Sequence, residues 1–290
     1  MNYVFLDGEF VTEEKAMISV YDHGFLYGDG VFEGIRAYNG LIFKLDEHID
    51  RLYDSAKAIS LNIPMTKAEI KKAIIETVRK NELKDAYIRP VVSRGKGAMG
   101  LNPVNCEKPT VVIIVTKIKV LDEKVYSEGL KAIVTSTRRS MPHMLNPRLK
   151  TCNYLVNILA KLEATNAGVS EAVMLNTNGY VTEGTADNIF IVKNNTVYTP
   201  PCYAGILKGI TRDTLINILK ESGSKLKEEL FTPFEVYTAD ECFITGTAVG
   251  LASIVNLDGR KIADGKPGPV ASMARKKLEE LMAQEGAKIY

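Results

Sequence analysis

The sequence lacks tryptophan altogether, and cysteine and histidine are rare. Its 290 residues include four cysteines and three histidines. The cysteines are far apart and form no Cys-x-x-Cys pair, and His23, His48 and His143 lack the spacing of metal ligands, so the sequence predicts no metal site. A signal peptide and long apolar runs are also missing, which predicts a reduced, cytoplasmic protein that does not span a membrane.

An excess of charge of one sign is missing as well. The chain has 37 Lys and Arg against 35 Asp and Glu, a formal net charge of +2. Such a balance offers no electrostatic footprint for nucleic acid or a membrane surface, so we expect neither as a partner. Apolar residues make up 46% and charged residues 25%, which is ordinary for a globular protein that can build a full core.

Apolar periodicities and turn signals alternate along the chain and predict a mixed α/β (α+β) protein. We expect hairpins around Asp7-Gly8, Asn39-Gly40, Asn178-Gly179 and Asn194-Asn195. The expected helices begin at Asp46 (as an N-cap), Lys67, Tyr154, Gly209 and Pro269. Because charge interrupts the pattern at Lys119–Glu128, we expect a domain over residues 1–118, a linker over 119–129 and a second domain over 130–290.

Lys150 lies just before the pattern Tyr154, Leu155, Ile158, Leu159, Leu162, which predicts the core face of a helix. A lysine at such a junction can be held by backbone on both sides and point into a cleft. Desolvation there lowers the pKa of the amine, so that it can attack a carbonyl carbon. Taken alone, such a lysine is more often a solvated surface residue.

Two segments are rich in glycine. Residues 21–36 contain four glycines, which are typical of a tight connector or of the wall of a site. Residues 94–103, between two expected strands, form a basic glycine-rich loop without the ending of a Walker motif. We interpret this second segment as a mobile lid or active-site loop.

Several short motifs carry more information together than any one of them. They are His48-Ile-Asp-Arg51-Leu52, Tyr87-Ile-Arg-Pro90, Arg148-Leu-Lys-Thr-Cys-Asn-Tyr-Leu155, Glu183-Gly-Thr-Ala-Asp-Asn188, Gly209-Ile-Thr-Arg212 and Gly246-Thr-Ala248. In this order and spacing the set resembles the fold-type IV pyridoxal-phosphate (PLP) aminotransferases, and within them the branched-chain amino acid aminotransferases. The resemblance extends from about Tyr21 to near the C-terminus. It implies the D-amino acid aminotransferase-like fold of two α/β domains, with the cofactor in the cleft between them, and a homodimer or higher oligomer.

The resemblance also implies a role for each motif. Lys150 would form the Schiff base with PLP and later act as the general base. Tyr154 would contact the phenolic oxygen of PLP, and Glu183 its pyridine nitrogen. The phosphate would be bound by Arg51, Ile210, Thr211, Gly246 and Thr247. The substrate would be bound by Tyr27, Phe32, Gly34, Tyr87, Arg89, Thr247 and Ala248. Taken singly, Tyr154 could instead be a core residue, Glu183 a surface residue at a strand end, and Thr211 an ordinary N-cap.

The predicted reaction is a ping-pong amino transfer between L-leucine, L-isoleucine or L-valine and 2-oxoglutarate. Sister enzymes of the same fold remain alternatives: a D-amino acid aminotransferase, an (R)-amine transaminase or aminodeoxychorismate lyase. Ser93-Arg94-Gly95 resembles the D-specific enzymes, in which an arginine near here helps to bind carboxylate, whereas Tyr87-Ile-Arg resembles the L-specific ones. A non-catalytic PLP-binding or scaffold protein is disfavoured, because the lysine, the acid and the phosphate-binding residues are all present.

Overall fold

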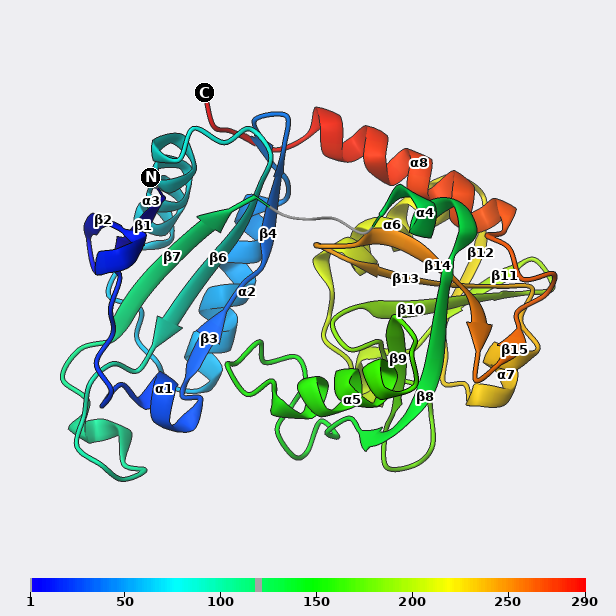
Figure 1. The fold of residues 1–290 in the computed structure, drawn as a ribbon, viewed down its shortest axis with the longest axis horizontal. Coiled ribbons are helices and arrows are strands. Elements are labelled where there is room, and N and C mark those ends of the chain that lie inside the picture. Colours follow the sequence, from blue (N-terminus) through cyan, green and yellow to red (C-terminus); the bar gives the residue numbers. More distant parts are fainter. Residues whose placement is uncertain (1, 118–121) are drawn as a thin grey trace. The chain divides into compact units, whose positions relative to one another are not determined.

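A computed structural model describes residues 2–117 and 122–290 of the chain (Figure 1). These residues divide into two compact units. The first contains residues 2–117, Leu149–Asn153 and Met282–Tyr290, and the second contains residues 122–148 and 154–281. The chain therefore returns to the first unit twice after leaving it. Of the expected linker, residues 119–121 lie outside the described residues, and Glu123–Glu128 form the short helix α4.

The first unit is built on an eight-stranded sheet with the order β16-β5-β4-β6-β7-β1-β2, in which β3 also pairs with β6. Its strands are β1 (Tyr3–Leu6), β2 (Glu9–Thr12), β3 (Gly30–Phe32), β4 (Ile35–Tyr38), β5 (Leu41–Ile42), β6 (Ala86–Ser93), β7 (Thr110–Thr116) and β16 (Ala287–Lys288). The hairpins expected around Asp7-Gly8 and Asn39-Gly40 are confirmed, with β1 paired to β2 and β4 to β5.

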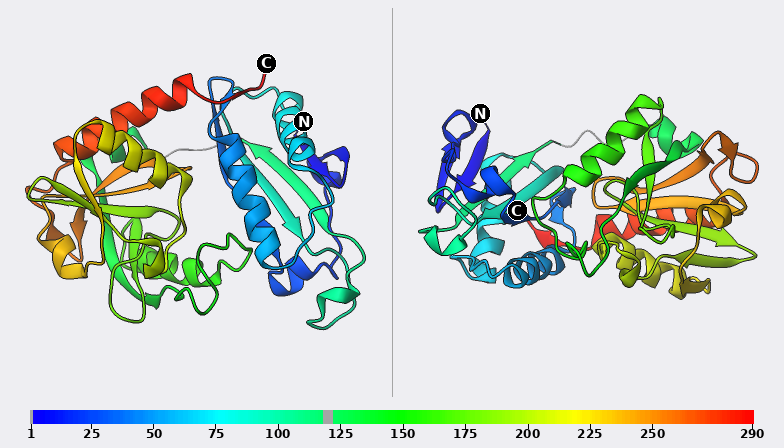
Figure 2. Two further views of the ribbon diagram at one scale, coloured as in Figure 1. Left: turned by 180° about the vertical axis from the view of Figure 1, so that it is seen from behind. Right: turned by 90° about the horizontal axis from the view of Figure 1, so that it is seen from below.

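Two helices, α2 (Leu45–Ala58) and α3 (Lys67–Lys80), cover one face of this sheet (Figure 2). Their buried side chains include Leu52 and Ile74, which join Ile88 of β6 in one core. A capping box at Thr66 begins α3 where it was expected. The expectation that Asp46 caps α2 is wrong: the N-cap is Lys44 in a left-handed conformation, and Asp46 lies in the first turn.

The second unit contains an eight-stranded mixed sheet with the order β12-β11-β10-β13-β14-β8-β9, in which β15 also pairs with β14. Its strands are β8 (Leu130–Arg138), β9 (Glu171–Leu175), β10 (Asn188–Lys193), β11 (Thr196–Thr199), β12 (Lys225–Glu228), β13 (Glu241–Gly246), β14 (Gly250–Leu257) and β15 (Arg260–Lys261). The other helices are α1 (His23–Tyr27) in the first unit and α5 (Leu155–Asn166), α6 (Ile210–Glu221), α7 (Pro233–Tyr237) and α8 (Pro269–Gln284). Short 3-10 helices cover Glu13–Lys15, Pro103–Asn105 and Cys202–Ala204.

The two hairpins expected in the second unit have different outcomes. The hairpin around Asn194-Asn195 is confirmed by the pairing of β10 with β11. The one around Asn178-Gly179 is confirmed only in part, because the returning residues 180–183 form no strand and pair back to β9 by a single bridge, Val181 to Leu175. Among the residues that the structure describes, no helix is long and apolar enough to cross a membrane.

Helix α5 corrects one expectation about packing. The side chains predicted to face the core are exposed: Leu155 66%, Ile158 54%, Leu159 46% and Leu162 49%. The helix is buried instead along its small and polar positions, Asn157, Ala160 and Ala164. Because α5 begins at Leu155 with Tyr154 as its N-cap, Lys150 and Tyr154 do not share a helix face.

Candidate active site

Lys150 lies in a short extended segment beside strand β3. Its carbonyl oxygen accepts the Phe32 amide at 3.0 Å, and its own amide donates to the Ser55 hydroxyl at 3.2 Å. Two residues on, the Cys152 amide donates to the carbonyl of Gly30 at 2.9 Å. The Lys150 backbone is therefore held by the backbone of β3 and by the Ser55 side chain of α2, rather than by backbone on both sides. Its Nζ atom lies 4.7 Å from the centre of the Phe32 ring.

Four predicted substrate-binding residues, Phe32, Gly34, Tyr87 and Arg89, are connected by contacts of Arg89 and the Tyr87 hydroxyl. The Arg89 guanidinium lies 4.6 Å from the centre of the Phe32 ring and donates from Nη2 to the Tyr87 hydroxyl at 2.5 Å. A Cβ atom at Gly34 would lie 2.3 Å from that hydroxyl, so only glycine leaves room for it. Among the described residues the buried Arg89 Nε has no hydrogen-bond partner. An unsatisfied buried donor of a cation suits an incoming carboxylate.

Arg51 is held by a residue that sequence reasoning missed. Arg51 donates from Nε and Nη2 to the two carboxylate oxygens of Glu33 at 2.7 and 2.8 Å. The ring nitrogen Nδ1 of His48 lies 2.7 Å from the same carboxylate. Two parallel bonds fix the plane of a guanidinium, so Glu33 determines where the remaining edge of Arg51 points.

The charge of Glu33 depends on these two partners. The side chain is 0% exposed, and burial by itself raises the pKa of its carboxyl group. The charges and hydrogen bonds of Arg51 and His48 outweigh burial and lower the pKa of Glu33 to about 2. A glutamate inside the apolar run Gly30–Ile35 is the signal that could have identified it, because a buried carboxylate requires a cationic partner.

In the second unit Glu183 is likewise buried and paired. One carboxylate oxygen accepts the Arg139 Nε at 2.7 Å, and the other accepts the Leu207 amide at 2.9 Å. Arg139 also donates from Nη1 to the Asn157 side chain on α5 at 3.0 Å. Glu183 is 4% exposed and therefore not a surface residue. A buried carboxylate needs a paired charge, and Arg139 supplies it to Glu183.

The N-terminus of α6 lies beside Glu183. The Asn188 side chain donates to Glu183 at 3.3 Å and to the Leu207 carbonyl at 2.9 Å. Asn188 Oδ1 comes so close to Gly209 that a Cβ there would lie 2.0 Å away. Gly209 is the N-cap of α6, so Thr211 is not an N-cap. Because glycine has no side chain, no side-chain oxygen caps the first amides of the helix. The first amides of a 12-residue helix, Ile210 and Thr211 among them, then favour an anion.

The last predicted group lies at the end of β13, where Gly246 is the final strand residue and Thr247 and Ala248 begin the turn to β14. Asn188 pairs with Thr245 in the β10–β13 ladder, which brings this turn to the start of β10. A Cβ at Gly246 would lie 2.2 Å from Asp187 Oδ1, so glycine is required at that position. The second unit thus gathers Glu183, the start of α6 and this turn around Asn188.

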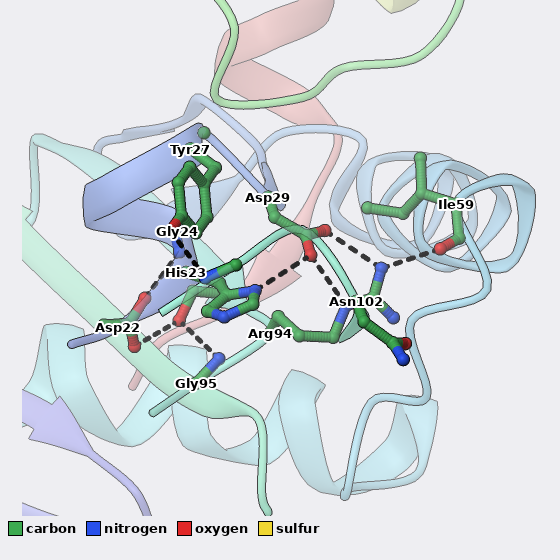
Figure 3. Close-up of polar contacts among 12 residues, drawn as sticks. Asp22, His23, Gly24, Tyr27, Asp29, Ile59, Arg94, Gly95 and Asn102 are labelled. Carbon is green, nitrogen blue, oxygen red and sulfur yellow. Dashed lines mark hydrogen bonds and ion pairs between the residues drawn. The ribbon is translucent and has the colours of Figure 1, made fainter. Parts of the chain in front are cut away.

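Tyr27 has different surroundings from Phe32. Its ring meets the His23 ring edge-on with centroids 5.0 Å apart, and its hydroxyl accepts the Gly100 amide at 3.0 Å. Figure 3 shows Tyr27 beside His23 and the charged pair of Asp29 and Arg94. That Tyr27 and Phe32 both contact the substrate stays a prediction.

The family model for "amino-transferase class IV" matches residues 30–257. A protein of Methanocaldococcus jannaschii, provisionally named a branched-chain-amino-acid aminotransferase, is 50% identical over 287 residues, which cover 99% of each chain. The crystal structure of the Escherichia coli branched-chain amino acid aminotransferase superposes with a TM-score of 0.95 at 34% identity, covering 99% of this chain and 96% of that one.

A second solved structure contains a cofactor adduct. It is a T.th. branched-chain amino acid aminotransferase complexed with N-(5'-phosphopyridoxyl)-L-glutamate. Its TM-score is 0.93 at 36% identity, and the match covers 97% of this chain and 94% of that chain. The expected fold is therefore confirmed. On the match over most of its length and on these relatives, the chain belongs to the class IV aminotransferases.

Proposed function

We propose that this protein is a PLP-dependent branched-chain amino acid aminotransferase, which exchanges amino groups between L-leucine, L-isoleucine or L-valine and 2-oxoglutarate. The observation that carries the proposal is the cluster at Phe32. An amine and a guanidinium, Lys150 Nζ and Arg89 Cζ, lie 4.7 and 4.6 Å from the centre of one ring. In such an enzyme the amine would react with the aldehyde of the cofactor, and the guanidinium would bind the carboxylate of the amino acid.

The polar groups of both units fit PLP. Arg51, oriented by Glu33, would bind the phosphate together with the amides of Ile210 and Thr211 and with the turn at Gly246 and Thr247. Glu183, paired with Arg139, would hold the proton of the pyridine nitrogen, and the Tyr154 hydroxyl would contact the phenolic oxygen. When bound, PLP supplies an electron sink that stabilises negative charge at the substrate Cα.

Lys150 would perform two tasks. Its Nζ would bind the aldehyde carbon of the cofactor covalently and, once displaced by the amino group of the substrate, would move a proton to and from the substrate Cα. The short segment 149–153 fixes the Lys150 backbone, so the amine moves only through its own side-chain torsions. Such a tethered base replaces a bimolecular proton transfer with an intramolecular one.

The substrate would be bound by its carboxylate and by its side chain. Arg89 and the Tyr87 hydroxyl, with the turn residues Thr247 and Ala248, would bind carboxylate, since Arg89 Nε still has a donor to offer. Phe32 and Tyr27 would contact the aliphatic side chain. Gly34 would keep the Tyr87 hydroxyl in its position.

We further propose that the protein acts in the cytoplasm as a homo-oligomer whose basic unit is a dimer. The exposed apolar face of α5 supports the proposal, because Leu155, Ile158, Leu159 and Leu162 form one stripe of large side chains at 46–66% exposure. A second copy of the chain would bury this stripe, since most soluble oligomers are symmetric assemblies of one chain.

The test is a substrate comparison on purified protein loaded with PLP. We expect glutamate formation from 2-oxoglutarate with L-leucine, L-isoleucine and L-valine, and none with D-alanine. Lys150→Ala is expected to abolish it. Activity with D-alanine alone would move the enzyme to the D-specific class, and full activity of Lys150→Ala would refute the role of the lysine.

A further inference from the structure

Arg94 is not free to bind a substrate carboxylate. It donates from Nε and Nη2 to the two oxygens of Asp29 at 3.0 and 2.9 Å. It also donates to the carbonyl oxygens of Ile59 and Ser60, just beyond helix α2, at 2.8 and 2.6 Å. Figure 3 shows the guanidinium between Asp29 and Ile59. Four of its five N–H donors are therefore used, its charge is already neutralised, and its side chain is only 11% exposed.

The partners of Arg94 join the loop of residues 95–103 to helix α1. The Arg94 amide donates to the Asp29 carbonyl at 2.9 Å, and the His23 amide donates to the Gly95 carbonyl at 3.0 Å. His23 lies 3.9 Å from the Asp29 carboxylate through Nδ1 and 3.1 Å from the Ala98 carbonyl through Nε2. His23 is therefore placed against the ion pair on one side and against the loop on the other.

The first residues of this loop have little freedom to move. A Cβ at Gly95 would lie 1.8 Å from the Lys108 carbonyl oxygen, and one at Gly97 would lie 2.7 Å from Cys106 Sγ. The buried Asp22 accepts hydrogen bonds from the Ser93 hydroxyl and the Gly24 amide, both at 2.7 Å. The base of the loop is thus packed and bonded on both sides.

The tip of the loop is linked to Tyr27. The Gly100 amide donates to the Tyr27 hydroxyl, and the Tyr27 ring packs edge-on against His23. A continuous chain of contacts therefore connects Arg94 to Tyr27 through Asp29 and His23.

We propose that Arg94 is a positioning residue that, through Asp29 and His23, holds Tyr27 and the tip of the loop as the side-chain wall of the substrate site. The proposal rests on the proposed function, in which Tyr27 contacts the substrate. It names Arg94 as a determinant of substrate side-chain size, and not as a ligand of the α-carboxylate.

The test compares amino acids with the same carboxylate and increasingly large side chains. In Arg94→Met we expect the KM for L-leucine to rise about tenfold, the loss expected when roughly two methylene-sized contacts disappear. The KM for L-norvaline should rise less, and that for L-2-aminobutyrate by less than about twofold. Arg94→Lys keeps the charge but not the fork of donors, so its values should fall between those of wild type and Arg94→Met.

A second readout needs no activity. Trypsin cleavage after the exposed Lys96 should be about tenfold faster in Arg94→Met, because the bonded base of the loop opens more often. Lys71→Met is the matched control: it removes an exposed ion pair with Asp46 on α2, and both readouts should equal those of wild type.

A KM that rises by one common factor for all three amino acids would overturn the proposal, because loss of a carboxylate ligand affects every substrate equally. Unchanged kinetics and unchanged cleavage in both Arg94 variants would overturn it as well. If the wild type transaminates none of these amino acids, the proposed function fails, and the cleavage rates alone decide whether Arg94 holds the loop.

Discussion

Replacing Glu33 by glutamine should leave a largely buried arginine, Arg51 with 14% of its side chain exposed, without its counter-ion. Glu33→Gln keeps the shape of the side chain, but Arg51 and His48 lose the carboxylate that accepts their hydrogen bonds. The pKa of Glu33 is lowered from 4.5 to about 2, and a shift of that size corresponds to about 3 kcal/mol. Removing one member of a buried ion pair costs about 3–5 kcal/mol in other proteins. Both routes predict a loss of about 3 kcal/mol in the stability of the first unit.

The assay is hydrogen exchange of the α2 amides in the cofactor-free protein, because the chain has no tryptophan to report unfolding. A loss of about 3 kcal/mol should make these amides exchange about 100-fold faster at pH 7. The control Lys71→Met removes an exposed pair and should change exchange by less than about fivefold. Affinity for PLP should fall more than affinity for pyridoxal, because only PLP carries the phosphate that Arg51 would bind.

The effect should also depend on pH in a defined direction. Because the pKa of Glu33 is lowered in the folded state, its stabilisation is fully present above about pH 4.5 and is lost as the pH falls through about 2. The difference in stability between wild type and Glu33→Gln should therefore shrink over that range. A variant that exchanges like wild type at pH 7 would show that Glu33 does not stabilise the first unit. Equal losses of affinity for pyridoxal and for PLP would show that Glu33 does not orient Arg51 towards the phosphate.

Three further predictions address other parts of the molecule. Gly34→Ala places a methyl group 2.3 Å from the Tyr87 hydroxyl, and overpacking of this kind costs about 1–3 kcal/mol. The KM for L-leucine should therefore rise while the fold is kept, and an unchanged KM would contradict the role of Tyr87. Ile158→Lys on the exposed face of α5 should shift the assembly towards smaller species in light scattering, whereas Lys276→Glu on the exposed surface of α8 should not. Burial raises the pKa of the Cys152 thiol to about 11, so about 0.1% of it is thiolate at pH 8. Iodoacetamide should therefore label Cys152 far more slowly than a free thiol, and labelling at the rate of a free thiol would contradict its burial.

Local sequence signals predicted local structure well. The helix at Lys67–Lys80 has a capping box and a regular apolar spacing, and the turn at Asp7-Gly8 uses two residues with positive φ. These features depend on neighbours within a few positions, so the sequence contains the whole cause. The side-chain face shared by Tyr87 and Arg89 follows in the same way from the two-residue period of a strand.

Long-range partners could not be predicted in this way. Arg94 pairs with Asp29, 65 residues earlier, and no periodicity connects the two. The segment around Lys150 leads into a helix as predicted, with Tyr154 as the N-cap of α5, but no local signal in the sequence predicted that the segment pairs with β3. The apolar stripe of α5 was assigned to the core because periodicity shows that a face is apolar and does not show what covers it.

The central claim is that Lys150 binds PLP covalently, and borohydride reduction followed by peptide mass spectrometry tests it most directly. The protein is loaded with PLP, reduced, digested with a protease other than trypsin and searched for the phosphopyridoxyl group on each lysine. We expect this group on Lys150, and we expect L-leucine added before reduction to remove it. A group found on another lysine, or none on Lys150 in protein that transaminates L-leucine, would contradict the covalent role of Lys150.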